Sequence, residues 1–136
     1  MKTLVLYYSY MGHTKALAEA LALKEVFDIC EIKDVKRPSI LGAFIRGGYA
    51  AITKKSWPIE PLTVDPAAYE HIILCAPVWG SNLPPAVNAA LANLPADITV
   101  SVKMVSGSGK SACKEKIEAL ITGKGSSLKD FEDIKA

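Results

Sequence analysis

Apolar runs alternate with amphipathic stretches along this chain, and this alternation predicts strands separated by helices. Lys2–Tyr8 and His71–Ala76 are near-continuous apolar runs, as expected of central parallel strands buried on both faces. Val26–Ile32 alternates between apolar and polar residues and predicts a shorter strand nearer an edge, and Thr99–Val105 predicts a fourth strand. Strands that alternate with helices are typical of a parallel sheet covered on both faces.

Apolar residues at helical spacing predict the helices. Three segments carry this spacing clearly: Thr14 to about Lys24, Pro85–Leu94 and Ser111–Ile121. Pro38–Lys55 also predicts a helix, although each of its glycines weakens it by about 1 kcal/mol relative to alanine. In Ser127–Ile134 the apolar residues lie three apart, which suits a helix, and a fifth edge strand is the alternative.

These elements predict one α/β domain over residues 1–136, an open, doubly wound parallel sheet with helices on both faces. Half of the residues are hydrophobic and 22% are charged, which suffices for a core. Sixteen Lys and Arg against fourteen Asp and Glu leave a net charge of +2, too small an excess to favour nucleic acid or a membrane surface as a partner. Without a long apolar run, a signal sequence or a Cys/His cluster, we expect a cytoplasmic protein with no structural metal.

Ligands of such sheets bind outside the carboxyl ends of the strands, so the loops there are the candidates for function. The first strand is followed by Ser9, Tyr10, Met11, Gly12, His13 and Thr14, which lead directly into a predicted helix. Backbone N–H groups at a helix N-terminus, hydroxyl side chains and a glycine together predict a phosphate cradle. In the alternative interpretation, Thr14 caps the helix and Gly12 only turns the chain.

The loop after the third predicted strand contains Pro77, Val78, Trp79 and Gly80. Prolines stiffen this loop, which suits the presentation of the flat Trp79 ring to a flat aromatic ligand. Alternatively, the ring folds back onto the core. Cys113 also has two interpretations, a thiol whose pKa is lowered by a helix N-terminus or a structural thiol.

At these loops the chain resembles the flavodoxin family. The likeness lies in YYSYMGHTKALAEAL, which matches the family's phosphate loop (Ser/Thr-x-Thr-Gly-x-Thr), and in APVWGSNLPPAV, and it extends through LGAFIRGGYAAITKK. The resemblance implies a flavodoxin-like sheet of strand order 2-1-3-4-5 and a bound flavin mononucleotide (FMN). Two features depart from the family pattern: Met11 replaces the usual threonine, and the loop after the fourth strand has no aromatic residue.

The resemblance also implies which residues hold FMN. The phosphate would lie on the loop formed by Ser9, Tyr10, Met11, Gly12, His13 and Thr14. Pro77, Val78, Trp79 and Gly80 would line the ribityl chain and one face of the isoalloxazine, and the backbone of Ser106, Gly107, Ser108 and Gly109 would hold the pyrimidine edge.

The function implied by the resemblance is that of a small electron carrier, whose partner is a redox protein or a small electron acceptor. A flavin-dependent reductase of quinones or similar acceptors, and a related domain without FMN, are the alternatives. A third alternative is nucleotide binding by Ser106–Ser111, which contains the Gly-Lys-Ser of a P-loop but has Met104 where the motif needs its first glycine. The acceptor and the oligomeric state stay open.

Overall fold

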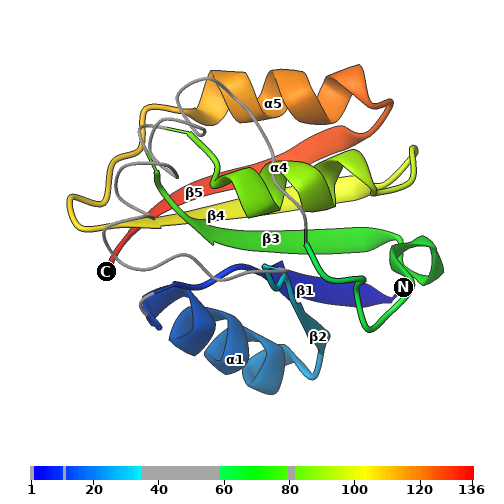
Figure 1. Cartoon of the computed structure of the whole chain (residues 1–136), viewed down its shortest axis with the longest axis horizontal. Coiled ribbons are helices and arrows are strands. Elements are labelled where there is room, and N and C mark those ends of the chain that lie inside the picture. The colour runs from blue at the N-terminus through cyan, green and yellow to red at the C-terminus, as the bar shows by residue number, and fades with distance from the viewer. Residues whose placement is uncertain (1, 11, 35–58, 80–81) are drawn as a thin grey trace.

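The computed structural model describes residues 2–10, 12–34, 59–79 and 82–136, and these form a parallel five-stranded sheet flanked by helices (Figure 1). The strands are β1 (Thr3–Tyr7), β2 (Asp28–Glu31), β3 (His71–Pro77), β4 (Thr99–Ser106) and β5 (Ser127–Lys135). The helices are α1 (His13–Glu25), α4 (Pro85–Ala92) and α5 (Lys114–Gly123), with a short 3-10 turn, η2 (Pro66–Ala68). The strand order β2-β1-β3-β4-β5 confirms the predicted sheet.

The apolar run of β1 is buried because the sheet has helices on both of its faces. Leu4 and Leu6 belong to the apolar cluster that also contains residues of α4 and α5, whereas Val5 and Tyr7 pack with residues of α1. β1 lies between β2 and β3, so its backbone is paired on both edges as well. Burial on every side explains why this strand reads as a continuous apolar segment.

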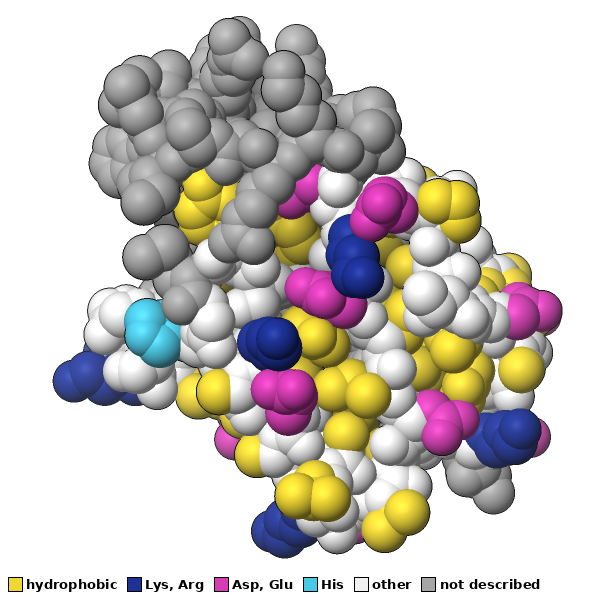
Figure 2. Space-filling view, turned by 60° about the horizontal axis from the view of Figure 1, so that its bottom comes forward, with side chains coloured by type: hydrophobic (Ala, Val, Ile, Leu, Met, Phe, Trp, Pro, Cys, Tyr) yellow, Lys and Arg dark blue, Asp and Glu magenta, His cyan; other side chains and the backbone are white. Residues whose placement is uncertain are grey.

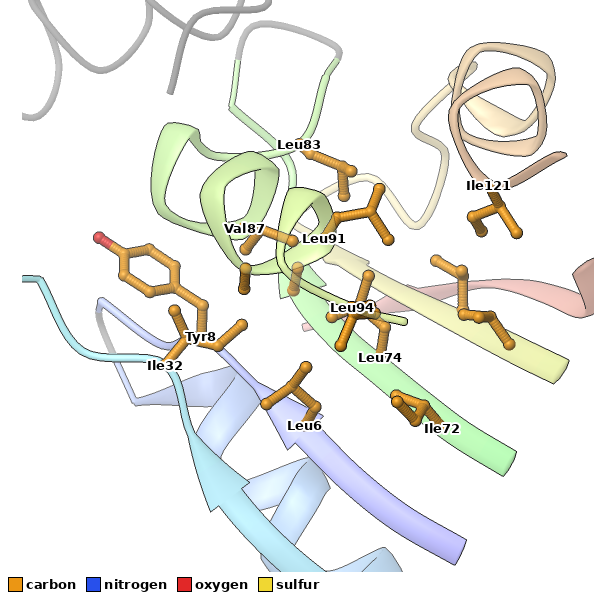
Figure 3. Packing of buried hydrophobic residues seen from close by; sticks show 14 of the residues in the cluster. Leu6, Tyr8, Ile32, Ile72, Leu74, Leu83, Val87, Leu91, Leu94 and Ile121 are labelled. Atoms are coloured by element: carbon orange, nitrogen blue, oxygen red, sulfur yellow. The ribbon is translucent and has the colours of Figure 1, made fainter. Parts of the chain in front are cut away.

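The larger core cluster fills the space between the sheet and the helices α4 and α5 (Figure 3). Val87 and Leu91 of α4 and Ile121 of α5 point at Ile72 and Leu74 of β3 and at the neighbouring strands. Burial of each such side chain contributes about 1.5–3 kcal/mol. The helices predicted for 85–94 and 111–121 are therefore confirmed as α4 and α5, and they pack over the strands whose carboxyl ends lie side by side.

The segment 127–134 belongs to the edge strand β5, so of the two alternatives the fifth strand is confirmed and the helix is wrong. In β5, Leu128 pairs with Val100 but the next partner, Ser101, pairs with Asp130. This register shift at Lys129 is a β-bulge, in which one extra residue is accommodated. Because of the extra residue, Leu128 and Phe131 both pack against the larger core although they are three apart.

Two predicted boundaries move for local reasons. β2 begins at Asp28 rather than Val26, because Val26 ends α1 in the left-handed conformation, with φ of 58°. α5 begins at Lys114 rather than Ser111, and Ala112 before it also has a positive φ of 56°. The helix predicted for Pro38–Lys55 lies outside the described residues.

On the sheet face that carries α1, the surface over β4 and β5 is formed by polar side chains that pair with one another. Nε2 of His71 lies 2.7 Å from Oγ of Ser101, which donates to Asp130 at 3.3 Å. Lys103 and Glu132 form an ion pair at 2.7 Å. On the face drawn in Figure 2, acidic and basic side chains are interspersed among apolar ones. In the described part of the chain, no helix has the length and apolar character needed to span a membrane.

Candidate functional site

A small cavity lies at the carboxyl edge of the sheet, where the loops after β1, β3 and β4 meet. β1 and β3 are neighbours, and the chain leaves β1 towards β2 but leaves β3 towards β4, so this edge is the topological switch point. The cavity has a volume of about 200 Å³. Its lining consists of Ser9, Tyr10, His13, Thr14, Pro77, Val78, Trp79, Val105, Ser106, Gly107 and Ala136.

The loop after β1 delivers an uncapped helix N-terminus to this cavity. Gly12 is the N-cap of α1 and has φ of 97°, a conformation that side chains strain. No side chain caps the helix, so the interpretation of Thr14 as the cap is wrong. The N–H groups of the first turn have no partner within the helix. The loop thus presents backbone donors and the positive end of the helix dipole.

Two hydroxyl groups supplement these donors. Oγ of Ser9 accepts a hydrogen bond from the N–H of Gly12 at 3.1 Å, so Ser9 stands beside the helix N-terminus. Thr14, in the first turn of α1, is 2% exposed and lines the cavity. An anion at this position would meet main-chain N–H groups together with side-chain O–H groups.

The loop after β3 places an indole against the first loop. Trp79 makes edge-to-face contacts with Tyr8, at 5.8 Å between ring centroids, and with Tyr10, at 5.9 Å. It also packs against the larger core cluster while lining the cavity. Both interpretations of Trp79 therefore hold in part: one side of its ring rests on the core and another faces the site.

Tyr8 supports this aromatic group from behind. Its ring is 2% exposed, and its hydroxyl donates to Oδ2 of Asp34 at 2.7 Å. The loop holding Trp79 is fixed by two backbone hydrogen bonds between Trp79 and Asn82, of 3.0 and 3.1 Å. Trp79 is thus held both by its neighbours and by its own turn.

The loop after β4 uses its donors internally. Oγ of Ser106 accepts from the N–H of Gly109 at 3.0 Å, and Oγ of Ser108 accepts from the N–H of Lys110 at 3.2 Å. The helix begins only at Lys114, three residues beyond the Gly-Lys-Ser sequence. Two of the N–H groups that a P-loop would offer to a phosphate are therefore already bonded, and the helix does not start at the loop, so the loop lacks the arrangement of a P-loop.

The described residues that line the cavity include few ionisable side chains. No Asp or Glu is among them, and His13 is the only one that is a Lys, Arg or His. Two carboxylates lie outside this lining. Asp34 accepts a hydrogen bond from Tyr8, and Asp133 of β5 accepts one from Ser111 at the end of the third loop.

The cysteines do not act as reactive thiols here. Cys113 is fully buried, and burial raises its pKa, so the interpretation of a thiol activated by a helix N-terminus is wrong. Burial also raises the pKa of Cys75 to about 12. All three cysteines are buried and free.

Most of the residues predicted from sequence converge on this cavity. Nine of them line it: Ser9, Tyr10, His13, Thr14, Pro77, Val78, Trp79, Ser106 and Gly107. Gly12 shapes the helix N-terminus without lining the cavity, Ser108 and Gly109 lie in the third loop away from it, and Met11 and Gly80 are outside the described residues. The sequence did not indicate Val105 and Ala136; assignment of 127–134 as a strand would have brought the residues after it, including Ala136, to this edge.

The fold has close counterparts among solved structures. A protein of Bacteroides eggerthii, provisionally described as a flavoprotein, superposes with a TM-score of 0.82 at 17% identity, over 96% of this chain and 86% of that one. A flavoprotein of Lactobacillus acidophilus in complex with FMN superposes with a TM-score of 0.73 at 22% identity, over 96% and 91%. Flavodoxin 2 of Bacillus cereus does so with a TM-score of 0.60 at 19% identity, over 99% and 84%.

These superpositions establish a flavodoxin-like fold for this chain. The sequence itself matches no protein-family model and no curated protein.

Proposed function

We propose that this chain binds FMN at the carboxyl edge of the sheet and carries electrons through it. One observation carries the proposal above the others: an uncapped helix N-terminus with a positive-φ glycine opens onto the same cavity as a partly buried indole. This arrangement pairs an anion site with an aromatic surface, as a flavin phosphate requires. The described neighbours of the same fold include a flavoprotein solved with FMN and several flavodoxins.

The residues of the first loop suit a phosphate. Main-chain N–H groups of the first turn of α1 would donate to it, and Ser9 and Thr14 would add hydroxyl donors. Nothing lies within 4 Å of the position that a Cβ would occupy on Gly12, so the approach to the helix end is open. Hydrogen bonds to a charged acceptor are stronger than those between neutral groups, which favours a dianion here.

The second and third loops suit the remainder of the cofactor. Trp79 and Tyr10 provide aromatic surface, and the backbone of Ser106 and Gly107 lines the opposite side of the cavity. The volume of about 200 Å³ is smaller than the roughly 300–1,000 Å³ of whole-ligand pockets, so these residues account for part of the contacts. A bound flavin supplies one- and two-electron transfer, and the protein binds and orients it.

Electron transfer to a redox protein or small acceptor is favoured by the scarcity of acid–base groups. The described lining residues include no Asp, Glu or Cys, and His13 is the only histidine among them. A carrier needs no such group, because its reaction is the gain and loss of electrons by the cofactor.

A second candidate is a flavin-dependent reductase of quinones or similar small acceptors. It is favoured by the composition of the third loop, in which Ser106, Gly107, Ser108 and Gly109 offer no aromatic side chain to cover a ring. A flavin face left uncovered on that side would be accessible to a flat acceptor.

The test begins with an absorbance spectrum of the purified protein over roughly 350–500 nm, the range in which a bound flavin absorbs. Flavin released by heating is identified by chromatography against FMN, FAD and riboflavin, and the protein freed of flavin is titrated with FMN. Release of FMN or saturable uptake of FMN is expected; failure of both would refute the proposal. Steady-state oxidation of reduced nicotinamide with a quinone acceptor then separates the reductase from the carrier.

A further inference from the structure

The loop between β4 and α5 is held in place by the end of β5. These two segments lie together at the carboxyl edge of the sheet (Figure 1). The N–H of Ala136 donates to the carbonyl of Ser106 at 2.8 Å, at the start of the loop. At the other end of the loop, Oγ of Ser111 donates to Oδ1 of Asp133 at 2.5 Å. Between these anchors, a Cβ on Gly109 would lie only 3.1 Å from Cβ of Lys135.

The Ser111–Asp133 hydrogen bond is the anchor formed by side chains. Ser111 is 3% exposed, so its hydroxyl is almost entirely removed from water and depends on a protein partner. Asp133 is exposed on β5 and accepts this bond as a carboxylate. A hydrogen bond to a charged acceptor is roughly twice as strong as a neutral one. Ser111 precedes Ala112, which has a positive φ of 56°, so this bond also stabilises a strained turn.

From these contacts we infer that Asp133 and Ser111 act as positioning residues for a flavin ring, holding the 106–111 loop in the shape that receives it. The inference rests on the proposed function. Neither residue lines the cavity, whereas Ser106 and Gly107 of the loop do. Their effect is exerted through the loop backbone, which is set before the ligand arrives and so loses little freedom on binding.

The matched comparison is between two neighbouring carboxylates of β5. Asp133 faces the loop and α5, whereas Glu132 faces the other side of the sheet, where it pairs with Lys103. Asp133→Ala and Glu132→Ala remove the same charge from adjacent positions, and only the first removes the anchor. Asp133→Asn removes the charge but keeps an oxygen that accepts the Ser111 hydrogen bond.

The experiment measures dissociation constants for FMN and for riboflavin by quenching of flavin fluorescence, on the full chain and its variants. Asp133→Ala is expected to weaken both ligands by the same factor, on the order of tenfold, since the phosphate lies at the other loop. Glu132→Ala should leave both constants unchanged, and Asp133→Asn should bind each flavin with an affinity between those of the parent and Asp133→Ala, because it keeps a neutral acceptor. Ser111→Ala should weaken binding as Asp133→Ala does, and the double variant should be no worse than either single variant.

Thermal unfolding of each ligand-free variant checks that it is folded. Should Asp133→Ala not fold, Ser111→Ala and Asp133→Asn carry the comparison. Equal affinities for parent, Asp133→Ala and Ser111→Ala would overturn the positioning role of Asp133 and Ser111 while leaving the proposed function intact. Equal losses in Asp133→Ala and Glu132→Ala would also overturn that role, because the effect would then be one of charge. A parent chain that binds neither flavin would refute the proposed function itself, and the positioning role with it.

Discussion

Two strand-to-helix turns of this molecule have similar residues but place the helix that follows them differently relative to the cavity. The turn after β1 and the turn after β4 both contain glycine and hydroxyl residues, and both lead to a helix. In the first, α1 follows Gly12 immediately and no side chain caps it. In both turns a serine accepts a hydrogen bond from a loop N–H group, Ser9 from Gly12 and Ser106 from Gly109. In the second turn, however, α5 begins only at Lys114, which does not line the cavity, and no side chain caps it either.

The difference shows that composition alone does not make a phosphate site. What decides is whether the start of the helix lies at the cavity. In the first turn, His13 and Thr14 at the start of α1 line the cavity, which makes this turn the candidate for the phosphate. In the second turn, α5 starts away from the cavity and the loop is anchored to β5, which makes this loop a wall of the site.

The largest expected effect comes from a negative charge at the first turn. Gly12→Asp places a carboxylate at the end of α1 and strains a backbone with φ of 97°. Repulsion between charges at this range amounts to about 1–4 kcal/mol, so FMN should bind on the order of 100-fold more weakly. The measurement is FMN affinity by fluorescence quenching.

Gly125→Asp is the matched control, since Gly125 also has a positive φ, of 84°, and lies away from the cavity. Equal losses in both variants would contradict the assignment of the first turn.

Removal of the indole beside the first turn should have the next largest effect. Trp79→Ala deletes the ring that contacts Tyr10 and lines the cavity. Aromatic contact is worth about 0.5–1.5 kcal/mol beyond burial, so FMN affinity should fall by roughly two- to tenfold or more. Fluorescence of the bound flavin should rise, and Trp79→Phe should retain part of the quenching. Unchanged affinity and emission in Trp79→Ala would mean that the indole serves only the core.

Hydroxyl deletions compare the two turns directly. Ser9→Ala and Thr14→Ala each remove a donor at the first turn, and each should weaken FMN binding by about 1 kcal/mol, or roughly fivefold. Ser108→Ala removes a hydroxyl that bonds Lys110 in the second turn and should leave the affinity close to that of the parent. Isothermal titration of the three variants with FMN measures the difference. A larger loss in Ser108→Ala than in Ser9→Ala would reverse the roles of the turns.

The smallest effect concerns the opposite edge of the sheet, which should not sense the ligand. Burial lowers the pKa of His71 below its ordinary value of 6.5. At a pH between the lowered pKa of the folded state and 6.5, the imidazole of His71 is protonated in the unfolded chain but not in the folded one. The free energy of unfolding therefore decreases as the pH falls through about 6.5. His71→Gln should flatten this part of the pH dependence of urea unfolding, without changing FMN affinity at any pH. A parallel change in FMN affinity would show that the site extends beyond the carboxyl edge.

Much of the fold could be predicted from sequence because β1, β3 and α1 carry strong local patterns. The buried run of β1 and the helical spacing of α1 are each sufficient on their own. β5 was ambiguous because its bulge at Lys129 gives a strand the spacing of a helix. A bulge depends on pairing with β4, which no local pattern reveals.

The candidate site could be predicted as far as its loops are local in sequence. Nine of the predicted residues meet at one cavity because the carboxyl ends of parallel strands share an edge. Asp34 behind Tyr8 and Asp133 behind Ser111 could not be found, because each is brought to its partner by another strand or its extension. The sequence also could not show how the N–H groups of the Gly-Lys-Ser turn are bonded, since this depends on side-chain hydrogen bonds within the folded loop.

The central claim, that the N-terminus of α1 holds the phosphate of FMN, is tested most directly by titrating the parent chain with FMN and with riboflavin. The two ligands differ only in the phosphate, so the ratio of their dissociation constants reports what the first turn contributes. Several charge-assisted hydrogen bonds and a helix dipole should make FMN bind more tightly by about 100-fold or more. Equal affinities for FMN and riboflavin would contradict the claim, even if both flavins bound.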